Sequence, residues 1–303
     1  MDRIVYLDNN ATTQMAQEVV SIMAENAGLY GNASSMHTLG RSSASAIQWA
    51  REEVAALIDS DPGEIYFVSG ASEANNTVFN VFRDRIDAGD TRNRILLSPV
   101  EHPASIETMK YLVSKGYKVE TVPVDGVGEL KLDELEKMMG EDVCLVSIMT
   151  GNNESGVIQP VKKAAEIAHK YGAYFHTDAT QAIGKIPVSV KDIGADYLSM
   201  SAHKFYGPKG IGVLYAKKGV PLSPFVHGGH QEKGYRAGTY NNQAIIGMGK
   251  AAELARVNLK SEHDQLWRLR EKLRKGIEER IPNIVVNGTN DEDKCLPGTL
   301  NVS

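Results

Sequence analysis

The alternation of short apolar runs with helical patterns is the feature that most constrains the fold of this chain. Six runs have the length and composition of buried strands, and they cover residues 64–69, 94–98, 143–149, 173–177, 196–201 and 212–216. Between them, apolar residues recur at helical spacing, as around Ile47 and Val54 and over residues 164–169. Strands that alternate with helices predict an α/β fold with a mainly parallel sheet flanked by helices.

Two more helices are expected in the last quarter of the chain. Residues 241–260 are rich in Ala, Gly and Ile and predict a long helix. A second, amphipathic helix is indicated by apolar residues at spacings of three and four, namely Leu266, Leu269, Leu273 and Ile277. Pro282 should end this helix, and residues 284–286 form a candidate strand.

The change of pattern near Ser261 predicts a domain boundary. We expect a large domain over residues 14–260, which bears the site, and a second, smaller α/β domain built from residues 1–13 and 261–303. The final residues, TLNVS, have the pattern of a strand that has just begun. We therefore expect the smaller domain to continue beyond Ser303.

Composition excludes several classes of function. The formal net charge is −5, and no run of Lys and Arg stands out, so nucleic acid is not an expected partner. The chain has no stretch of about 18 apolar residues and no secretory signal, so we expect no contact with a membrane. The 2 cysteines do not make a disulfide framework, which is typical of a protein of the reducing cytoplasm.

The segment SGASEANN, residues 69–76, follows a predicted strand and opens a predicted helix. Free backbone N–H groups at the start of a helix favour an anion, and small residues such as Ala71 let a phosphate approach. The hydroxyl of Ser72 adds a donor. The alternative is an ordinary helix cap, with Glu73 completing a capping box.

Three further polar groups follow predicted strands. His102 lies just past one strand and is able to stack on a flat ring or move a proton. Asp178 ends another, where a carboxylate can pair with a protonated ring nitrogen. Lys204 follows a third, in SAHK, and a desolvated lysine suits Schiff-base chemistry. Taken singly, they are also a surface histidine, a helix cap and an exposed lysine.

Together, these features are the parts that a pyridoxal-phosphate (PLP) site needs, and their order resembles the fold-type I PLP transferases. Within that class-V aminotransferase-like group the chain resembles the cysteine desulfurases over essentially its whole length. The segments that carry the resemblance are LDNNATT, GNASSMHTLGR, SGASEANN, EHPA, NNESGVIQP, HTDATQ, SAHKFYGPKGIG and GGHQEKGYRAGT.

The resemblance implies a role for each matching residue. Lys204 would carry PLP as a Schiff base and take the substrate Cα proton, and His102 would stack on the ring and shuttle protons. Asp178 would pair with the pyridine nitrogen. Gln181 and Asn153 would bond the ring hydroxyl side. The phosphate would be held by Ala71, Ser72, Ser201, His203 and, from the neighbouring subunit of a homodimer, Thr239.

The implied reaction converts L-cysteine to L-alanine and leaves the sulfur as an enzyme persulfide. The sulfur acceptor would be a partner such as an iron–sulfur scaffold protein, for iron–sulfur cluster assembly or tRNA thiolation. The chain departs from the family in one respect, because the nucleophilic cysteine and an arginine for the substrate carboxylate are expected beyond Ser303. Cys144 is expected to be a buried small hydrophobe, and Cys295 a poorly activated thiol among Asp and Glu.

Two alternatives stay open at this point. One is a selenocysteine lyase or another PLP lyase or aminotransferase, and the other is a non-catalytic, desulfurase-like subunit. His227 and His230, in HGGHQ, have no cluster of Cys or carboxylate around them in sequence, so no metal site is expected.

Overall fold

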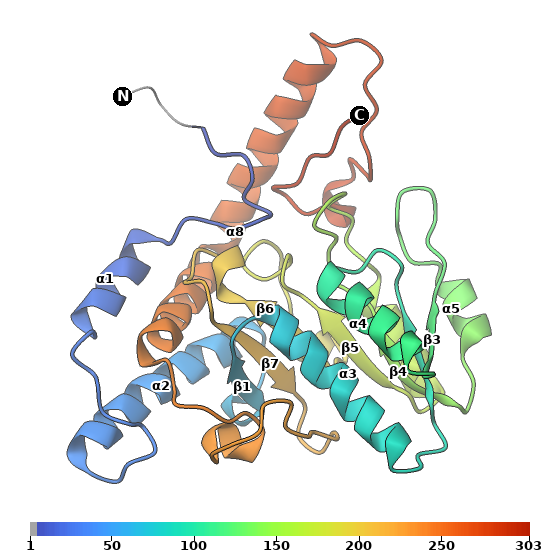
Figure 1. Ribbon diagram of the computed structural model, residues 1–303. Helices are drawn as coiled ribbons and strands as arrows, with labels where there is room; N and C mark the ends of the chain where they lie inside the picture. The colour runs from blue at the N-terminus through green and yellow to red at the C-terminus, as the bar shows by residue number, and fades with distance from the viewer. Residues whose placement is uncertain (1–4) are drawn as a thin grey trace.

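The computed structural model of the protein describes residues 5–303, and its centre is a seven-stranded sheet (Figure 1). The strand order is β1-β7-β6-β5-β4-β2-β3. The strands are β1 (Ile65–Val68), β2 (Arg94–Leu97), β3 (Lys118–Thr121), β4 (Val143–Ser147), β5 (Tyr174–Asp178), β6 (Tyr197–Ser201) and β7 (Gly212–Ala216). Neighbouring strands from β3 to β6 are parallel, and β7 runs antiparallel to both β1 and β6.

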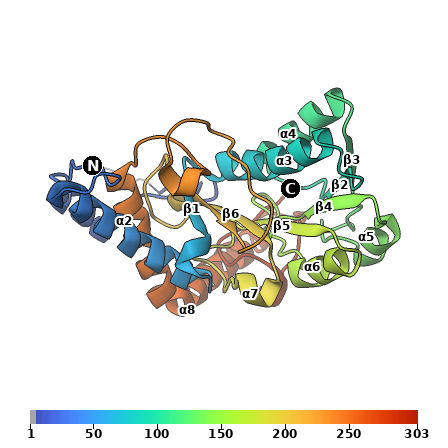
Figure 2. The ribbon, with the colours of Figure 1, turned by 90° about the horizontal axis from the view of Figure 1, so that it is seen from below.

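Helices cover both faces of the sheet, as the view from below shows (Figure 2). The helices are α1 (Gln17–Glu25), α2 (Thr38–Leu57), α3 (Ala71–Asp87), α4 (Pro103–Ser114), α5 (Leu132–Met138), α6 (Val161–Lys170), α7 (Val190–Ile193) and α8 (Asn242–Glu278). Residues of α3 and α4 pack in one apolar core, and residues of α2, α6, α7 and α8 pack in the other. The molecule is therefore a three-layer α/β structure, and the predicted fold class is confirmed.

All six predicted strands are present, with ends that differ by at most two residues. The sequence missed β3, which has the composition KVET and lies mostly exposed at the edge of the sheet. A strand that lies exposed to solvent at the edge of a sheet has no apolar run by which the sequence could indicate it. Residues 284–286 form no strand, because Val286 makes only an isolated bridge with Val302.

The two helices expected on either side of Ser261 are one helix, α8, which spans 37 residues. Its first half is apolar because it packs against α2 and the core, while its second half extends past the sheet (Figure 1). The change in composition at Ser261 thus follows a change of surroundings within one helix. The proposed division into domains stays a prediction. Within residues 5–303, no helix has both the length and the apolarity needed to cross a lipid bilayer.

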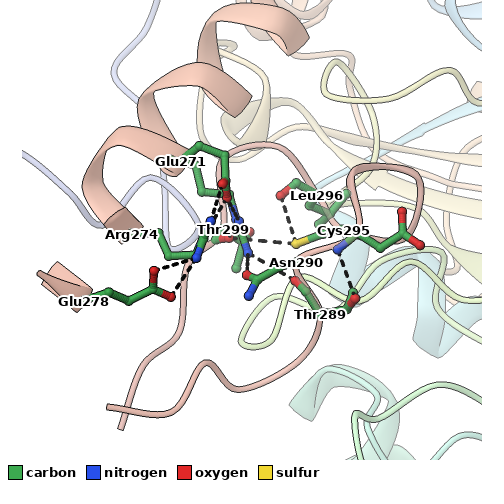
Figure 3. A network of polar contacts seen from close by, with 10 residues as sticks. Glu271, Arg274, Glu278, Thr289, Asn290, Cys295, Leu296 and Thr299 are labelled. Atoms are coloured by element: carbon green, nitrogen blue, oxygen red, sulfur yellow. Dashed lines mark hydrogen bonds and ion pairs between the residues drawn. The ribbon is translucent and has the colours of Figure 1, made fainter. Parts of the chain in front are cut away.

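A buried arginine fastens the C-terminal segment to α8. Arg270 is 5% exposed, and its guanidinium donates to the carbonyl oxygens of Thr299 (2.7 Å) and Thr289 (3.1 Å) and to Asn290 Oδ1 (3.1 Å). Figure 3 shows Thr289, Asn290 and Thr299 gathered beside the helix. Because burying a polar group is costly unless it is hydrogen-bonded, this guanidinium and its acceptors depend on one another.

Arg270→Met is expected to lower the free energy of unfolding by about 1–3 kcal/mol, because it leaves the buried carbonyl oxygen of Thr299 without its guanidinium donor. Arg274→Met, one turn along the same helix, removes ion pairs to Glu271 and Glu278 and should cost less than about 1 kcal/mol. Urea denaturation of both variants measures the difference. Equal losses of unfolding free energy in the two variants would contradict the larger stabilising role assigned to Arg270.

Candidate active site

The site forms where β1, β5 and β6 end, and a glycine of β7 makes this possible. Gly212 pairs with Val68 at the end of β1 and with Ser201 at the end of β6. A Cβ added to Gly212 would lie 2.6 Å from Gly70 Cα and 2.6 Å from the carbonyl oxygen of Met200. No side chain fits there, so the start of α3 and the segment after β6 lie close together.

These strand ends enclose a cavity of about 480 Å³. Every predicted site residue except one contributes to its wall, namely Ala71, Ser72, His102, Asn153, Asp178, Gln181, Ser201, His203 and Lys204. The exception is Thr239, which is exposed and borders a neighbouring pocket. The fold thus brings together residues that lie as far apart in sequence as Ala71 and Lys204.

Asp178 is 4% exposed, and two donors hold its carboxylate. Oδ2 accepts from Asn75 Nδ2 at 2.7 Å, and Oδ1 accepts from the backbone N–H of Thr180 at 3.0 Å. Asn75 was not among the residues expected in the site, although it lies inside the SGASEANN motif. These two hydrogen bonds fix the orientation of a carboxylate that lines the cavity, which suits a partner that carries a positive charge.

Lys204 is partly buried at the end of the segment that follows β6. Its Nζ donates to the carbonyl oxygens of Asn10 and of Ala11, the latter at 2.9 Å. Burial lowers the pKa of the Lys204 ammonium, against the attraction of Asp178 and Asp8, which raises it. A lowered pKa makes the neutral, nucleophilic amine more accessible.

Asn10 joins several parts of the site, which the sequence analysis did not foresee. Its carbonyl oxygen also accepts from Gln181 Nε2 at 2.8 Å. Its side chain donates to the carbonyl oxygen of Asn153 at 3.0 Å and to Thr299 Oγ1 at 2.9 Å. The LDNNATT motif is one of the segments that carry the family resemblance, but nothing in its composition indicates that a backbone oxygen faces the lysine.

The first turn of α3 faces the cavity at the place where the sequence predicts an anion cup, and the cup itself stays a prediction. Ala71 and Ser72 line the cavity. The first N–H groups of a helix have no acceptor within the helix itself, so they are available to an anion. Glu73, which the alternative placed in a capping box, has other partners. Its carboxylate accepts from the N–H of Ser69 (2.8 Å) and from Nε of Arg236 (2.9 Å). This ion pair offsets the acid that lies nearest the cup.

The two histidines of the cavity differ in their surroundings. His102 is the N-cap of α4, where its Nδ1 accepts from the N–H of Ala104 at 3.1 Å and its Nε2 is left for a proton. His203 Nδ1 lies 3.1 Å from Thr12 Oγ1. Burial, helped by the positive charges of two nearby lysines, lowers the pKa of His203 to about 4, so its ring is neutral at pH 7. Exposed Lys209 also lines the cavity and adds positive charge.

Both cysteines lie away from the cavity. Cys144 is buried in β4, where burial raises the pKa of its thiol to about 12. Cys295 was expected in a polar loop, with its thiolate disfavoured by acidic neighbours. It is instead fully buried, with its Sγ near the carbonyl oxygens of Leu296 and Thr299 (Figure 3), and burial is the main cause of its raised pKa. Over residues 5–303, no three His, Cys, Asp or Glu side chains gather as a metal site would require.

Comparison with known proteins gives consistent matches. The family described as Aminotransferase class-V matches residues 5–303. A cysteine desulfurase of Sinorhizobium fredii is 46% identical over 305 residues, which cover 99% of this chain and 77% of that protein. The cysteine desulfurase IscS of Clostridium botulinum is 41% identical over 308 residues, covering 100% of this chain and 76% of that protein.

Solved structures agree. A NifS-like protein has a TM-score of 0.94 at 42% identity, and the match covers 99% of this chain and 82% of that one. SspA, solved in complex with cysteine, has a TM-score of 0.88 at 31% identity, with 99% of this chain and 83% of that one covered.

Glu101, beside His102, is buried with one oxygen bonded to the N–H of Met149 at 2.6 Å; the other has no partner among residues 5–303. Burial, with the nearby negative charge of Asp178, raises the pKa of this carboxyl well above its usual value. The folded chain then holds a proton that the unfolded chain releases, so this contribution to stability is present below about pH 4.3 and is lost as pH rises.

Glu101→Gln is therefore expected to stabilise the protein relative to wild type at pH 8, by about 1.4 kcal/mol for each unit of pKa shift, and to lose that advantage toward pH 4.5. Thermal unfolding across this pH range measures the effect. Glu107→Gln, an exposed residue of α4, is the control and should show no such trend. A pH-independent difference for Glu101→Gln would contradict the assignment.

Proposed function

Because the chain belongs to the class-V aminotransferase family, and within it to the cysteine desulfurases, we propose that it removes sulfur from L-cysteine with PLP. The products are L-alanine and a persulfide on an accepting cysteine thiol. The observation that carries the proposal is the position of Lys204. Its amine lies in one cavity with the carboxylate of Asp178 and the anion cup of α3.

The residues present fit PLP, because the cavity offers each group that this molecule requires. Asp178, fixed by Asn75, would hold the pyridine nitrogen. Two atoms in this region, Asn75 Oδ1 and Thr180 Oγ1, are buried without a partner among residues 5–303, and Thr180 lines the cavity. The phosphate would be held by Ala71, Ser72, Ser201 and His203. When bound, PLP supplies an electron sink for the bonds at the substrate Cα.

Attachment of the cofactor, proton transfer and orientation of the ring would be carried out by side chains of this chain. Lys204 would attach the cofactor and then accept the Cα proton on its Nζ, which the carbonyl oxygens of Asn10 and Ala11 orient. His102 would stack on the ring and hold or pass a proton at Nε2. Gln181 and Asn153 would bond the ring hydroxyl side and orient it.

A homodimer is part of the proposal. Thr239 is exposed and outside the cavity of its own chain, as expected of a residue that serves the partner's phosphate. The loop that bears it is held against α3 and α2, since Arg236 bonds Glu73 of α3 and the buried Glu232 pairs with Arg51 of α2 at 2.7 Å. A rigid exposed loop can reach into a second subunit at little entropic cost.

The sulfur acceptor proposed is an iron–sulfur scaffold protein or a tRNA-thiolation protein. The proposed location is the cytoplasm. Its support is that Cys144 and Cys295 are both buried and neither is in a disulfide, as suits a reducing compartment.

Lys204→Ala tests the cofactor assignment directly. After incubation with PLP and reduction with borohydride, the intact mass of the wild type should rise by one reduced PLP per chain, and that of the variant should not change. Lys209→Ala, a second lysine of the same cavity, is the control and should still be labelled. Label on Lys204→Ala, or none on the wild type, would sink the assignment.

Asp178→Ala should lower the rate of alanine formation from L-cysteine by about a hundredfold or more, because the ring nitrogen loses its charge partner. The assay contains a thiol reductant that accepts the sulfur, and alanine is quantified by chromatography. L-selenocysteine is supplied in parallel. Turnover of selenocysteine with none of cysteine would replace the proposal by a selenocysteine lyase.

A further inference from the structure

A second lysine, Lys185, lies buried behind the cavity wall. It is 8% exposed, and its Nζ donates to Gln181 Oε1 at 2.7 Å. It makes no ion pair with any carboxylate within residues 5–303. Lys185 does not line the cavity itself, and the family resemblance gave it no role. An isolated buried ammonium is costly, and an apolar side chain of similar shape would pack there more cheaply.

The partners of Gln181 fix which way its amide points. The ammonium of Lys185 has only donors, so it must meet the amide oxygen. The carbonyl oxygen of Asn10 only accepts, and it meets Nε2 at 2.8 Å. Turning the amide over would set two donors against each other on one side and two acceptors on the other. Gln181 Nε2 has two N–H groups, and Asn10 uses one of them. The second is left for a ligand in the cavity that Gln181 lines.

The charges around Lys185 leave this contact as its main partner. Burial, with the positive charge of Lys204, lowers the pKa of Lys185 to about 8, and the negative charge of Glu262 on α8 opposes the shift. Glu262 is itself partly buried and is bonded by Tyr206. Gln181 Oε1 is thus the acceptor of the hydrogen bond that Lys185 donates.

We propose that Lys185 is a positioning residue: it holds the Gln181 carboxamide with its oxygen turned inward and its amino group presented to the ligand. The inference rests on the proposed function, because the ligand in question is the ring hydroxyl side of PLP. Lys185 does not line the cavity, and its hydrogen-bonded contact with the site is through Gln181.

The test compares PLP-loaded wild type, Lys185→Met, Gln181→Met and the double variant. Met has nearly the shape of the Lys stem, and removing a costly buried ammonium offsets the donor that Gln181 Oε1 loses, so thermal stability should change little. PLP should be lost from Lys185→Met roughly threefold faster, and from Gln181→Met roughly fivefold faster, as expected for weakening or loss of one hydrogen bond. The double variant should match Gln181→Met in its rate of PLP loss, because the hydrogen bond of Lys185 reaches the site only through Gln181.

A second readout is insensitive to a purely structural role. A hydrogen bond donated to the ring oxygen favours its deprotonated form, so removing it should raise the pH midpoint of the bound cofactor's visible absorbance. We expect a rise of about 0.7 unit in Gln181→Met and a smaller rise in Lys185→Met. Lys191→Met, an exposed lysine paired with Asp59, is the control and should leave both readouts unchanged.

Wild-type retention and midpoint in Lys185→Met would overturn the inference, as would additive losses in the double variant. Either result would leave the proposed function intact, provided that wild type carries PLP on Lys204. A wild type with no PLP fixed by borohydride would overturn both.

Discussion

The absence of a side chain at Gly212 is the constraint on which the site depends. β7 is inserted antiparallel between β1 and β6, so one residue pairs with the ends of both neighbours. Gly70 Cα and the carbonyl oxygen of Met200 would each lie 2.6 Å from a Cβ at this point. The spacing between the first turn of α3 and the segment of Lys204 is therefore set by the backbone of the sheet, to which both segments are attached.

The second requirement is that both terminal segments of the described chain meet at this cavity. Asn10 offers its carbonyl oxygen to Lys204 and Gln181 and its side chain to Thr299. The carbonyl oxygen of Thr299 in turn accepts from Arg270 of α8. A buried polar group that loses its partner costs about 1–3 kcal/mol, so these contacts are mutually dependent. The lysine is thus oriented by a segment almost two hundred residues earlier in the sequence, and that segment is tied through Thr299 to the long helix.

What the sequence could predict follows from how local each signal is. Apolar runs identified six strands, and strand ends identified Asp178 and Lys204, because open α/β sheets place ligands there. β3 was missed since KVET is solvated, and α8 was divided because its surroundings change at its middle. Asn75 and Lys185 were not singled out, because their meaning comes from Asp178 and Gln181 in the fold. The burial of Cys295 likewise depends on packing in the fold, which its acidic neighbours in the sequence do not indicate.

The charges of the site complete the argument about what it holds. Lys204 and Lys209 line the cavity, and Lys185 lies behind it, whereas Asp178 is the acid that faces inward without a cationic side chain bonded to it. Glu73 is offset by Arg236, and His203 is neutral. The charge of the cavity is therefore positive near the first turn of α3 and negative only at the carboxylate of Asp178, which Asn75 and Thr180 hold in place. A ligand that matches this pattern carries an anionic group at the start of α3, a cationic nitrogen at Asp178, and an electrophilic carbon within reach of Lys204, and PLP has all three.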